Sequence, residues 1–321
     1  MNLVTDKTIK VRLSLVCCEP TGASVLTRLA PNTRTRTLPV FQVKTKDFTD
    51  LEASIRNKLG PLISDSLTTL EQIETGFESG QLTCDVLGLI TQRSSFRLPA
   101  SDWWPMFNLF PWEDWRKGMP KTVRKILLPQ LLMWAERLPD DGELNRSSIR
   151  SLFEGANGNW RCEHLVQRYD LLYRAGLLPE ALRDQSGASV SVRHHHIAVF
   201  GQTMFRRDRR QLGMAISKLR QDLQYRPMLY SLVAGPFSLG QLQKSTEHLT
   251  GLGLHTQNFR RDILRSGLIK AAPTSLKSST NKAAKLYQWM PDINIATNAT
   301  GIPMPRKKHP NSAPTAEIFE T

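Results

Sequence analysis

A helix, a tight glycine turn and a second, basic helix follow one another between residues 239 and 267. The first helix follows Ser238, a residue type that often caps helix N-termini, and ends at Gly251. A Leu-Gly-Leu turn occupies residues 252–254, and the second helix begins near Thr256. A helix-turn-helix has this order, and its second helix fits the major groove of DNA. The pattern therefore predicts a helix-turn-helix in this region.

The second helix divides into an apolar face and a basic face. The helical period predicts that Phe259, Ile263 and Leu264 point inward. Arginine can form two hydrogen bonds with a guanine edge, and asparagine or glutamine can do the same with adenine. The expected DNA-binding residues of this helix are Gln257, Asn258, Arg260, Arg261 and Arg265, with Lys244 on the preceding helix.

The segments on either side complete a winged-helix pattern. Apolar residues at three- and four-residue steps predict a core helix over residues 207–225, and a short second element follows Pro227. After the recognition helix, the chain enters a stretch rich in Lys, Ser and Thr and returns through residues 286–289. This order predicts a β-hairpin wing whose Lys282 and Lys285 contact phosphates or the minor groove.

The excess of positive charge lies in the same region. Residues 201–290 contain 15 Lys and Arg against 4 Asp and Glu, whereas the whole chain has 43 against 29. A surface with this surplus releases counterions from a polyanion, which favours nucleic acid as a partner. A solvated basic face or an acidic protein partner is the alternative that charge alone leaves open.

The length and composition fit a soluble cytoplasmic protein of two domains and a tail. A chain of 321 residues exceeds a single domain of about 100–200 residues. No window approaches the roughly 18 apolar residues of a membrane span, so no membrane contact is expected. The four cysteines have no zinc-site spacing and are expected to be reduced thiols. Residues 194–196 are three histidines without a nearby Cys or carboxylate, so we expect neither a metal nor a cofactor.

Several short motifs resemble those of one family. Ala215–Arg220, Phe237–Leu239, Gln257–Arg261 and Gly267-Leu268 are similar to the winged-helix half of the Nudix-related bacterial regulators of NAD metabolism. Upstream, Phe110–Arg116 and Arg168–Leu177 resemble the subgroup that represses genes of de novo NAD biosynthesis, as do Met204 and Asp208. The resemblance implies an α+β fold, with a degenerate Nudix-like α/β/α domain followed by a winged helix-turn-helix domain.

The resemblance makes it possible to test the N-terminal half for a working Nudix box, G-x5-E-x7-R-E-U-x-E-E-x-G-U. With the last glycine at Gly60, the Arg-Glu pair falls on Ala53-Ser54 and the Glu-Glu pair on Asn57-Lys58. Several glutamates are needed to hold Mg²⁺ and activate water, yet Glu52 is the sole glutamate between residues 20 and 70. We therefore predict that the domain is not an enzyme and no longer hydrolyses nucleotides.

A Nudix-like domain without catalysis can still bind a nucleotide, and the resemblance implies an effector such as ATP, NAD or ADP-ribose. Strands are expected over residues 9–16 and 85–90. Arg28, Arg34 and Arg36 are expected in a loop between strands, where they meet a phosphate or form only an exposed basic loop. Aromatic residues crowd the segment 103–115, which indicates core packing, a ligand slot or a dimer contact.

The predicted organisation is a sensing domain over residues 1–195, a winged helix over 196–290 and a disordered tail over 291–321. The predicted function is a homodimeric repressor of NAD biosynthesis or related genes, bound to a palindromic operator in double-stranded DNA and controlled by the nucleotide. An active Nudix hydrolase with an appended basic domain is the first alternative. A protein that binds nucleic acid without sequence preference is the second.

Overall fold

The computed structural model describes residues 8–31, 33, 35–44, 51–60, 67–96, 98–138, 146–155, 160–186, 199–226, 228–273 and 285–291. Seven strands form one mixed sheet in the N-terminal part: β1 (Thr8–Glu19), β2 (Gly22–Leu29), β3 (Arg36–Thr37), β4 (Val40–Lys44), β5 (Leu67–Glu78), β6 (Gln81–Ile90) and β7 (Ser101–Pro105).

Strand β1 lies at the centre of this sheet. It pairs in parallel with β6 and antiparallel with β2 and β4, while β5 extends the sheet beyond β6, and β3 and β7 pair with β2. The alternation predicted for residues 9–16 is confirmed, because Ile9, Val11, Leu13 and Leu15 are all buried on one face. The strand predicted at 85–90 is the second half of β6.

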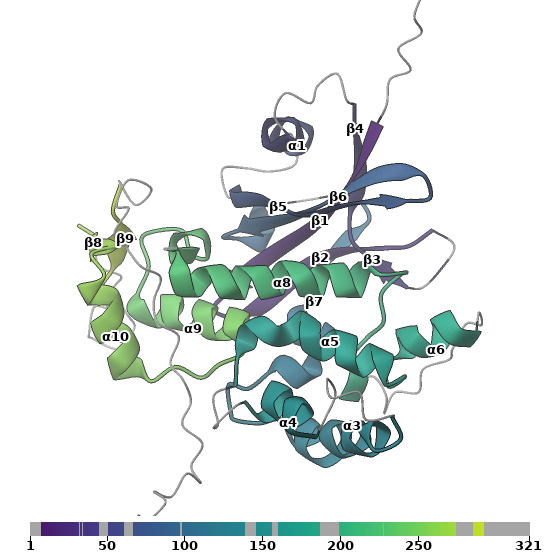
Figure 1. The fold of residues 1–321 in the computed structure, drawn as a ribbon. Helices are drawn as coiled ribbons and strands as arrows, with labels where there is room; N and C mark the ends of the chain where they lie inside the picture. The colour runs from purple at the N-terminus through teal and green to yellow at the C-terminus, as the bar shows by residue number, and fades with distance from the viewer. Residues whose placement is uncertain are drawn as a thin grey trace, which may run out of the picture.

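A short helix, α1 (Leu51–Leu59), covers this face of the sheet (Figure 1). Its Ile55 and Leu59 are buried in the same core cluster as the alternating residues of β1. The i, i+4 spacing of these two residues places both on the helix stripe that meets the sheet.

A larger helical layer covers the opposite face, where Val16 and Val25 join a second core cluster. Its helical elements are α2 (Met106–Leu109), η4 (Pro111–Glu113), α3 (Leu128–Ala135), α4 (Arg146–Glu154), α5 (Leu165–Arg174), α6 (Pro179–Ser186) and α8 (Asp208–Tyr225). Two of these helices are preceded by irregular turns. A π-helix, η5 (Val123–Leu127), precedes α3, and a 3-10 turn, η6 (Cys162–His164), precedes α5.

The remaining elements form the predicted winged helix. A 3-10 turn, η7 (Met228–Ser231), leads to α9 (Leu239–Thr250), α10 (Thr256–Arg265) and the antiparallel pair β8 (Ile269–Ala271) and β9 (Tyr287–Trp289). Helix α8 was expected to belong to this part, yet it also packs against α5, η6 and strands β1, β5 and β6. It therefore runs along the large sheet toward the winged helix (Figure 1). The domain boundary at 195/196 stays a prediction.

Within the described ranges, no helix combines the length and apolar character needed to cross a membrane.

Candidate DNA interface and ligand pockets

Helix α10 presents a polar, basic face to solvent. Phe259 and Ile263 are buried and hold the helix on the domain core. Leu264 was predicted to point inward, but half of its surface is exposed. The reason is helical geometry, because residue 264 lies about 100° around the axis from Ile263 and therefore leaves the buried stripe. The residues of this helix that were expected to bind DNA are all exposed: Gln257, Asn258, Arg260, Arg261 and Arg265.

The turn before α10 is held by side chains of α9. Gln243 donates through Nε2 to the carbonyl of Leu254 at 3.0 Å, and Glu247 Oε1 accepts from the Leu254 amide at 2.8 Å. Helix α9 begins at the predicted cap Ser238, which forms a capping box with Gln241, and it ends at Gly251 in the left-handed conformation. These contacts fix the angle between the two helices.

The wing is anchored by aromatic residues. Phe237 and Tyr287 exchange two backbone hydrogen bonds of 2.8 Å, which adds a third strand segment to β8 and β9. The rings of Phe237 and Trp289 lie 4.7 Å apart, and Trp289 Nε1 donates to the Val233 carbonyl. Lys285 is exposed at the base of the wing, whereas Lys282 lies outside the described residues.

Two further lysines lie on this domain. Lys244, on α9, is exposed as expected. Lys270, on β8, is also exposed, although it was not singled out from the sequence. Its position in a strand that flanks the recognition helix could have indicated that Lys270 is exposed, because alternate residues of a wing strand face solvent.

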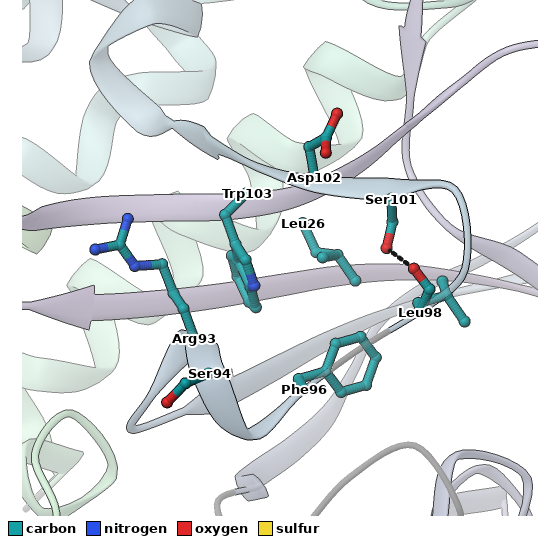
Figure 2. A pocket seen from close by; sticks show the side chains of 8 residues that line it. All are labelled: Leu26, Arg93, Ser94, Phe96, Leu98, Ser101, Asp102 and Trp103. Carbon is teal, nitrogen blue, oxygen red and sulfur yellow. Dashed lines mark hydrogen bonds between the residues drawn. The ribbon is translucent and has the colours of Figure 1, made fainter.

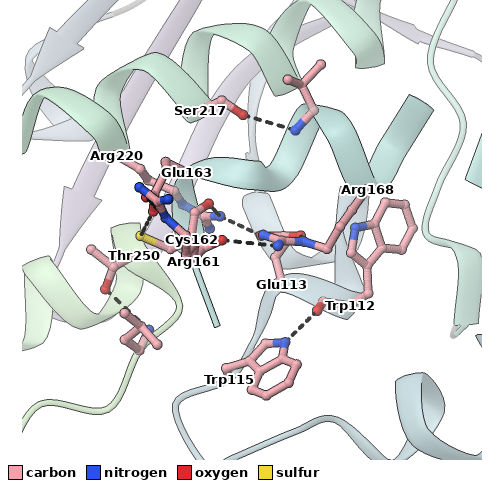
Figure 3. A network of polar contacts seen from close by, with 12 residues as sticks. Trp112, Glu113, Trp115, Arg161, Cys162, Glu163, Arg168, Ser217, Arg220 and Thr250 are labelled. Carbon is pink, nitrogen blue, oxygen red and sulfur yellow. Dashed lines mark hydrogen bonds and ion pairs between the residues drawn. The ribbon is translucent and has the colours of Figure 1, made fainter. Parts of the chain in front are cut away.

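A buried ion network joins the helical layer to the winged helix (Figure 3). Glu113 is fully buried and binds Arg168 through both oxygens, at 2.6 and 2.9 Å. Arg220 of α8 binds the same carboxylate at 2.6 Å and donates through Nε to the carbonyl of Leu249 in α9. The sequence held a signal for this, since Arg220 stands four residues after Ile216 and so falls on the buried stripe of α8.

The segment after η4 contacts the helix-turn-helix turn directly. Trp115 forms a bridge with Leu252, and a Cβ on Gly251 would lie 2.1 Å from the Glu113 carbonyl oxygen. Arg116 contacts the ring of His248 in the last turn of α9. Burial and the neighbouring guanidinium lower the pKa of His248. Phe110, Trp112 and Trp115 of the aromatic segment are buried, in agreement with the core-packing interpretation, whereas Trp103 is only partly buried and lines a hollow.

Helix α1 contains the positions on which the sequence analysis placed the Arg-Glu and Glu-Glu pairs of a Nudix box. Glu52 is exposed and pairs with Arg56 one turn later, at 2.8 Å. Among the described residues, no group of three or more His, Cys, Asp or Glu side chains could hold a metal ion. The three histidines at 194–196 lie outside the described residues.

One hollow of about 410 Å³ lies beside η3 (Arg93–Ser95) and β7 (Figure 2). The rings of Phe96 and Trp103 meet edge to face at 6.5 Å and form its apolar wall. Its one cation, Arg93, is already paired with Glu19 at 2.5 Å. This pocket suits a flat apolar group better than a phosphate.

A second hollow of about 270 Å³ lies where β1 and β2 meet the start of α8. Arg28 lines it, but Arg28 and Arg36 lie in strands β2 and β3, not in the predicted loop. The pairing of Arg28 with Thr37 and of Leu29 with Arg36 extends the sheet through both positions. Arg36 stacks on Trp104 at 3.6 Å and is not a lining residue, while Arg34 lies outside the described residues.

Acidic groups below this second hollow are tied to a buried arginine. Arg12 binds Asp85 at 2.8 Å and Asp208 at 3.1 Å, and it also contacts Glu78. Burial raises the pKa of Asp85 to about 6, although the Arg12 guanidinium opposes this shift. Burial likewise raises the pKa of Asp208.

Comparison with known proteins identifies the C-terminal part. Residues 229–289 match the family model described as the NrtR DNA-binding winged helix domain. No curated protein sequence matches the chain at a significant level.

Solved structures extend the likeness to the whole fold. NrtR of Shewanella oneidensis complexed with a 27mer DNA has a TM-score of 0.52 at 14% identity, over 92% of this chain and 98% of that chain. Another structure of Shewanella oneidensis NrtR has a TM-score of 0.51 at 14% identity, over 89% and 95%. A MutT/nudix family protein from Enterococcus faecalis has a TM-score of 0.46 at 12% identity, over 89% of each chain. The chain thus shares the overall fold of Shewanella oneidensis NrtR, and its C-terminal part matches the NrtR winged-helix model.

Proposed function

We infer that this chain is a transcriptional repressor that binds a palindromic operator as a homodimer and controls genes of NAD biosynthesis or related metabolism. The observation that carries this inference is the exposed face of α10. Three arginines, one asparagine and one glutamine face solvent on a helix whose turn is held rigid by Gln243 and Glu247. Such a helix can enter a major groove without first being ordered.

The polar groups of α10 suit both base reading and phosphate contact. Arg261 lies near the centre of the exposed face, opposite Phe259 and Ile263, where it would reach base edges. The His255 side chain caps none of the first amides of α10, so these N–H groups are available to a backbone phosphate. Lys244, Lys282 and Lys285 would add phosphate contacts on the two sides of the helix.

Two copies are needed for a useful affinity. One recognition helix covers only a few base pairs, whereas a two-fold dimer engages two symmetric half-sites and multiplies their contributions. The binding mode in NrtR complexed with a 27mer DNA is the natural comparison for this arrangement.

The Nudix-like domain would act as a sensor without hydrolysis. Glu52, the sole glutamate near the degenerate box, is bound to Arg56, and among the described residues it belongs to no group of three or more side chains that could hold a Mg²⁺ ion. A nucleotide such as ATP, NAD or ADP-ribose would bind this domain and shift the dimer between states that differ in DNA affinity.

Selection of bound sites from random DNA, repeated with and without these nucleotides, tests the proposal. Enrichment of a palindrome is expected. Arg260→Ala and Arg261→Ala should each weaken specific binding by about 1–3 kcal/mol for a lost bidentate contact. Arg150→Ala serves as the matched control, because Arg150 is an exposed arginine on α4 that pairs with Glu154. Wild-type affinity in both α10 variants would refute this mode of binding.

The two alternatives have distinct signatures. Turnover of ADP-ribose or NADH with Mg²⁺ above about 0.1 per second would indicate an active hydrolase. Steep salt dependence together with equal affinity for every sequence would indicate general nucleic-acid binding.

A further inference from the structure

We propose that the hollow between β1, β2 and the start of α8 binds the phosphates of the regulating nucleotide. This rests on the proposed function and names the site within the Nudix-like domain. The charged groups that line the hollow come from three distant parts of the chain: Lys10, Arg12, Arg28, Glu78, Arg206 and Asp208. The fold alone brings them together, since almost 200 residues separate the first from the last.

The charges of this hollow do not balance. Lys10 pairs with Glu78 at 2.8 Å, and Arg12 is occupied by Asp85 and Asp208. For Arg28 and Arg206, the described part of the chain supplies no acidic partner. Two guanidinium groups therefore remain for an external anion.

The backbone at Arg206 is in a conformation that favours glycine. Its φ is 48°, which is uncommon for a residue with a side chain. Neighbouring contacts hold this geometry: the Phe205 amide donates to the Arg36 carbonyl at 2.7 Å, and Arg183 donates to the carbonyls of Met204 and Arg206. Strained residues of this kind gather at ligand sites, where the side chain is needed for function. An arginine at a glycine-type position indicates that its charge matters.

The size and rim of the hollow define the ligand class. About 270 Å³ admits a diphosphate and part of a sugar. Guanidinium groups bind phosphate oxygens through two parallel hydrogen bonds, so Arg28 and Arg206 suit a doubly charged group. At the rim, Leu29 is 58% exposed and Val40 is 36% exposed, which offers an apolar surface to a base. The ligand is therefore a nucleotide that carries a diphosphate or longer phosphate chain.

The hollow beside Trp103 lacks these properties. Its arginine is paired with Glu19, and its remaining charged residue, Asp102, is acidic. A phosphate would meet no free cation there.

Calorimetric titration of the full chain with ADP, inorganic diphosphate and adenosine tests the site. ADP and diphosphate should bind the wild type, and adenosine should bind at least about tenfold more weakly than ADP, because it lacks the charged group. Arg28→Ala and Arg206→Gly should each weaken ADP binding by about tenfold or more. Arg206→Lys, which keeps the positive charge, should retain more of the affinity than Arg206→Gly.

The glycine variant separates ligand binding from folding. Since glycine adopts a positive φ without strain, Arg206→Gly should keep or raise the thermal unfolding midpoint while ADP affinity falls. Arg207→Ala is the matched control, because Arg207 is an exposed arginine next in the chain that does not line the hollow. Its ADP affinity should equal that of the wild type.

Unchanged ADP binding in both Arg28→Ala and Arg206→Gly would overturn the site, as would a wild type that binds neither ADP nor diphosphate. Loss of ADP binding in Trp103→Ala alone would also overturn it and place the ligand in the other hollow. Binding of the selected DNA in the absence of nucleotide is measured in parallel. If DNA binding persists while the phosphate site fails, only the site is wrong; if DNA binding fails, the proposed function is wrong.

Discussion

Leu264 shows how one residue can change the chemistry of a surface. It is an exposed apolar side chain on a helix whose neighbouring exposed residues are Arg260, Arg261 and Arg265. A leucine gains nothing from solvent exposure at this place. On a recognition helix, however, an apolar side chain can contact the methyl group of thymine.

We therefore predict that Leu264→Ala weakens specific DNA binding while stability stays unchanged. Loss of about 50 Å² of apolar contact corresponds to about 1 kcal/mol, or about fivefold in affinity. Gel-shift titrations with the selected operator measure this change, and Phe77→Ala on β5, whose side chain is 78% exposed, is the control. A variant that binds as tightly as the wild type would show that Leu264 contacts no base.

The four cysteines lie in apolar surroundings that suppress their ionisation. All four are buried, and burial raises the pKa of Cys17 and of Cys162 to about 12. A thiol in the unfolded chain ionises near about pH 8.5. The pKa of Cys17 and Cys162 is therefore higher in the folded protein than in the unfolded chain. The folded state keeps its full stability below the pKa of the unfolded thiols. It loses stability as the pH rises from there toward 12.

Two results should follow from this shift. At about pH 8, a thiol reagent should modify native Cys17 and Cys162 about a thousandfold more slowly than the same residues of the unfolded chain, because so little thiolate is present. The free energy of unfolding, measured with urea, should decrease as the pH rises above about 9. Rapid modification of a native thiol would contradict the raised pKa values.

At the scale of elements, the helix-turn-helix turn depends on the segment around η4. The chain passes so close at Gly251 that only a residue without a Cβ avoids the Glu113 carbonyl. Gly251 also has a φ of 74°. Glycine is therefore favoured at this position for two reasons, the left-handed backbone and the close approach of Glu113. Close docking of this kind means that α9 and α10 move only if the helical layer moves with them.

Gly251→Ala should therefore destabilise the protein more than Gly267→Ala. Gly267 has a similar φ of 70° after α10, yet no atom lies within 4 Å of an added Cβ. Gly267→Ala, the control, should lower the free energy of unfolding only by the cost of the left-handed backbone, about 1 kcal/mol. In Gly251→Ala the clash with Glu113 should at least double this loss. Urea unfolding measures both values. Equal losses would mean that the turn does not rest on Glu113.

At the scale of the whole molecule, α8 connects the two functions. It begins at Asp208, which accepts hydrogen bonds from Thr37 and the Leu38 amide beside the proposed phosphate site. Near its other end, Arg220 donates to Leu249 in α9. One continuous helix thus contacts both the hollow proposed to bind phosphate and the winged helix.

We expect the active species to be a dimer of twice 36.4 kDa on a two-fold operator. Half-sites should lie about 34–36 Å apart, or a multiple of this, because both recognition helices must enter the same side of the duplex. Sedimentation of the chain with operator DNA measures the mass. Destroying one half-site should weaken binding by about a hundredfold or more, while changing flanking bases should not. A monomer bound to a single half-site would contradict this.

Local patterns in the chain were sufficient to predict the elements of the winged helix. The leucine spacing and the cap at Ser238 predicted α9, the glycine turn and the exposed cations of α10, because these features depend on contacts within a few residues. The degenerate Nudix box was inferred from the spacing of residues alone, and it stays a prediction.

Long-range packing decided the rest. Arg28 and Arg206 are 178 positions apart, and no local pattern could show that both line one hollow or that Glu113 holds two arginines beside α9. Leu264 was misplaced for a related reason: periodicity states which residues share a face, but the width of the buried stripe depends on what packs against it. Charge pairing and close backbone approach are properties of the assembled fold, because they depend on distances that only tertiary contacts set.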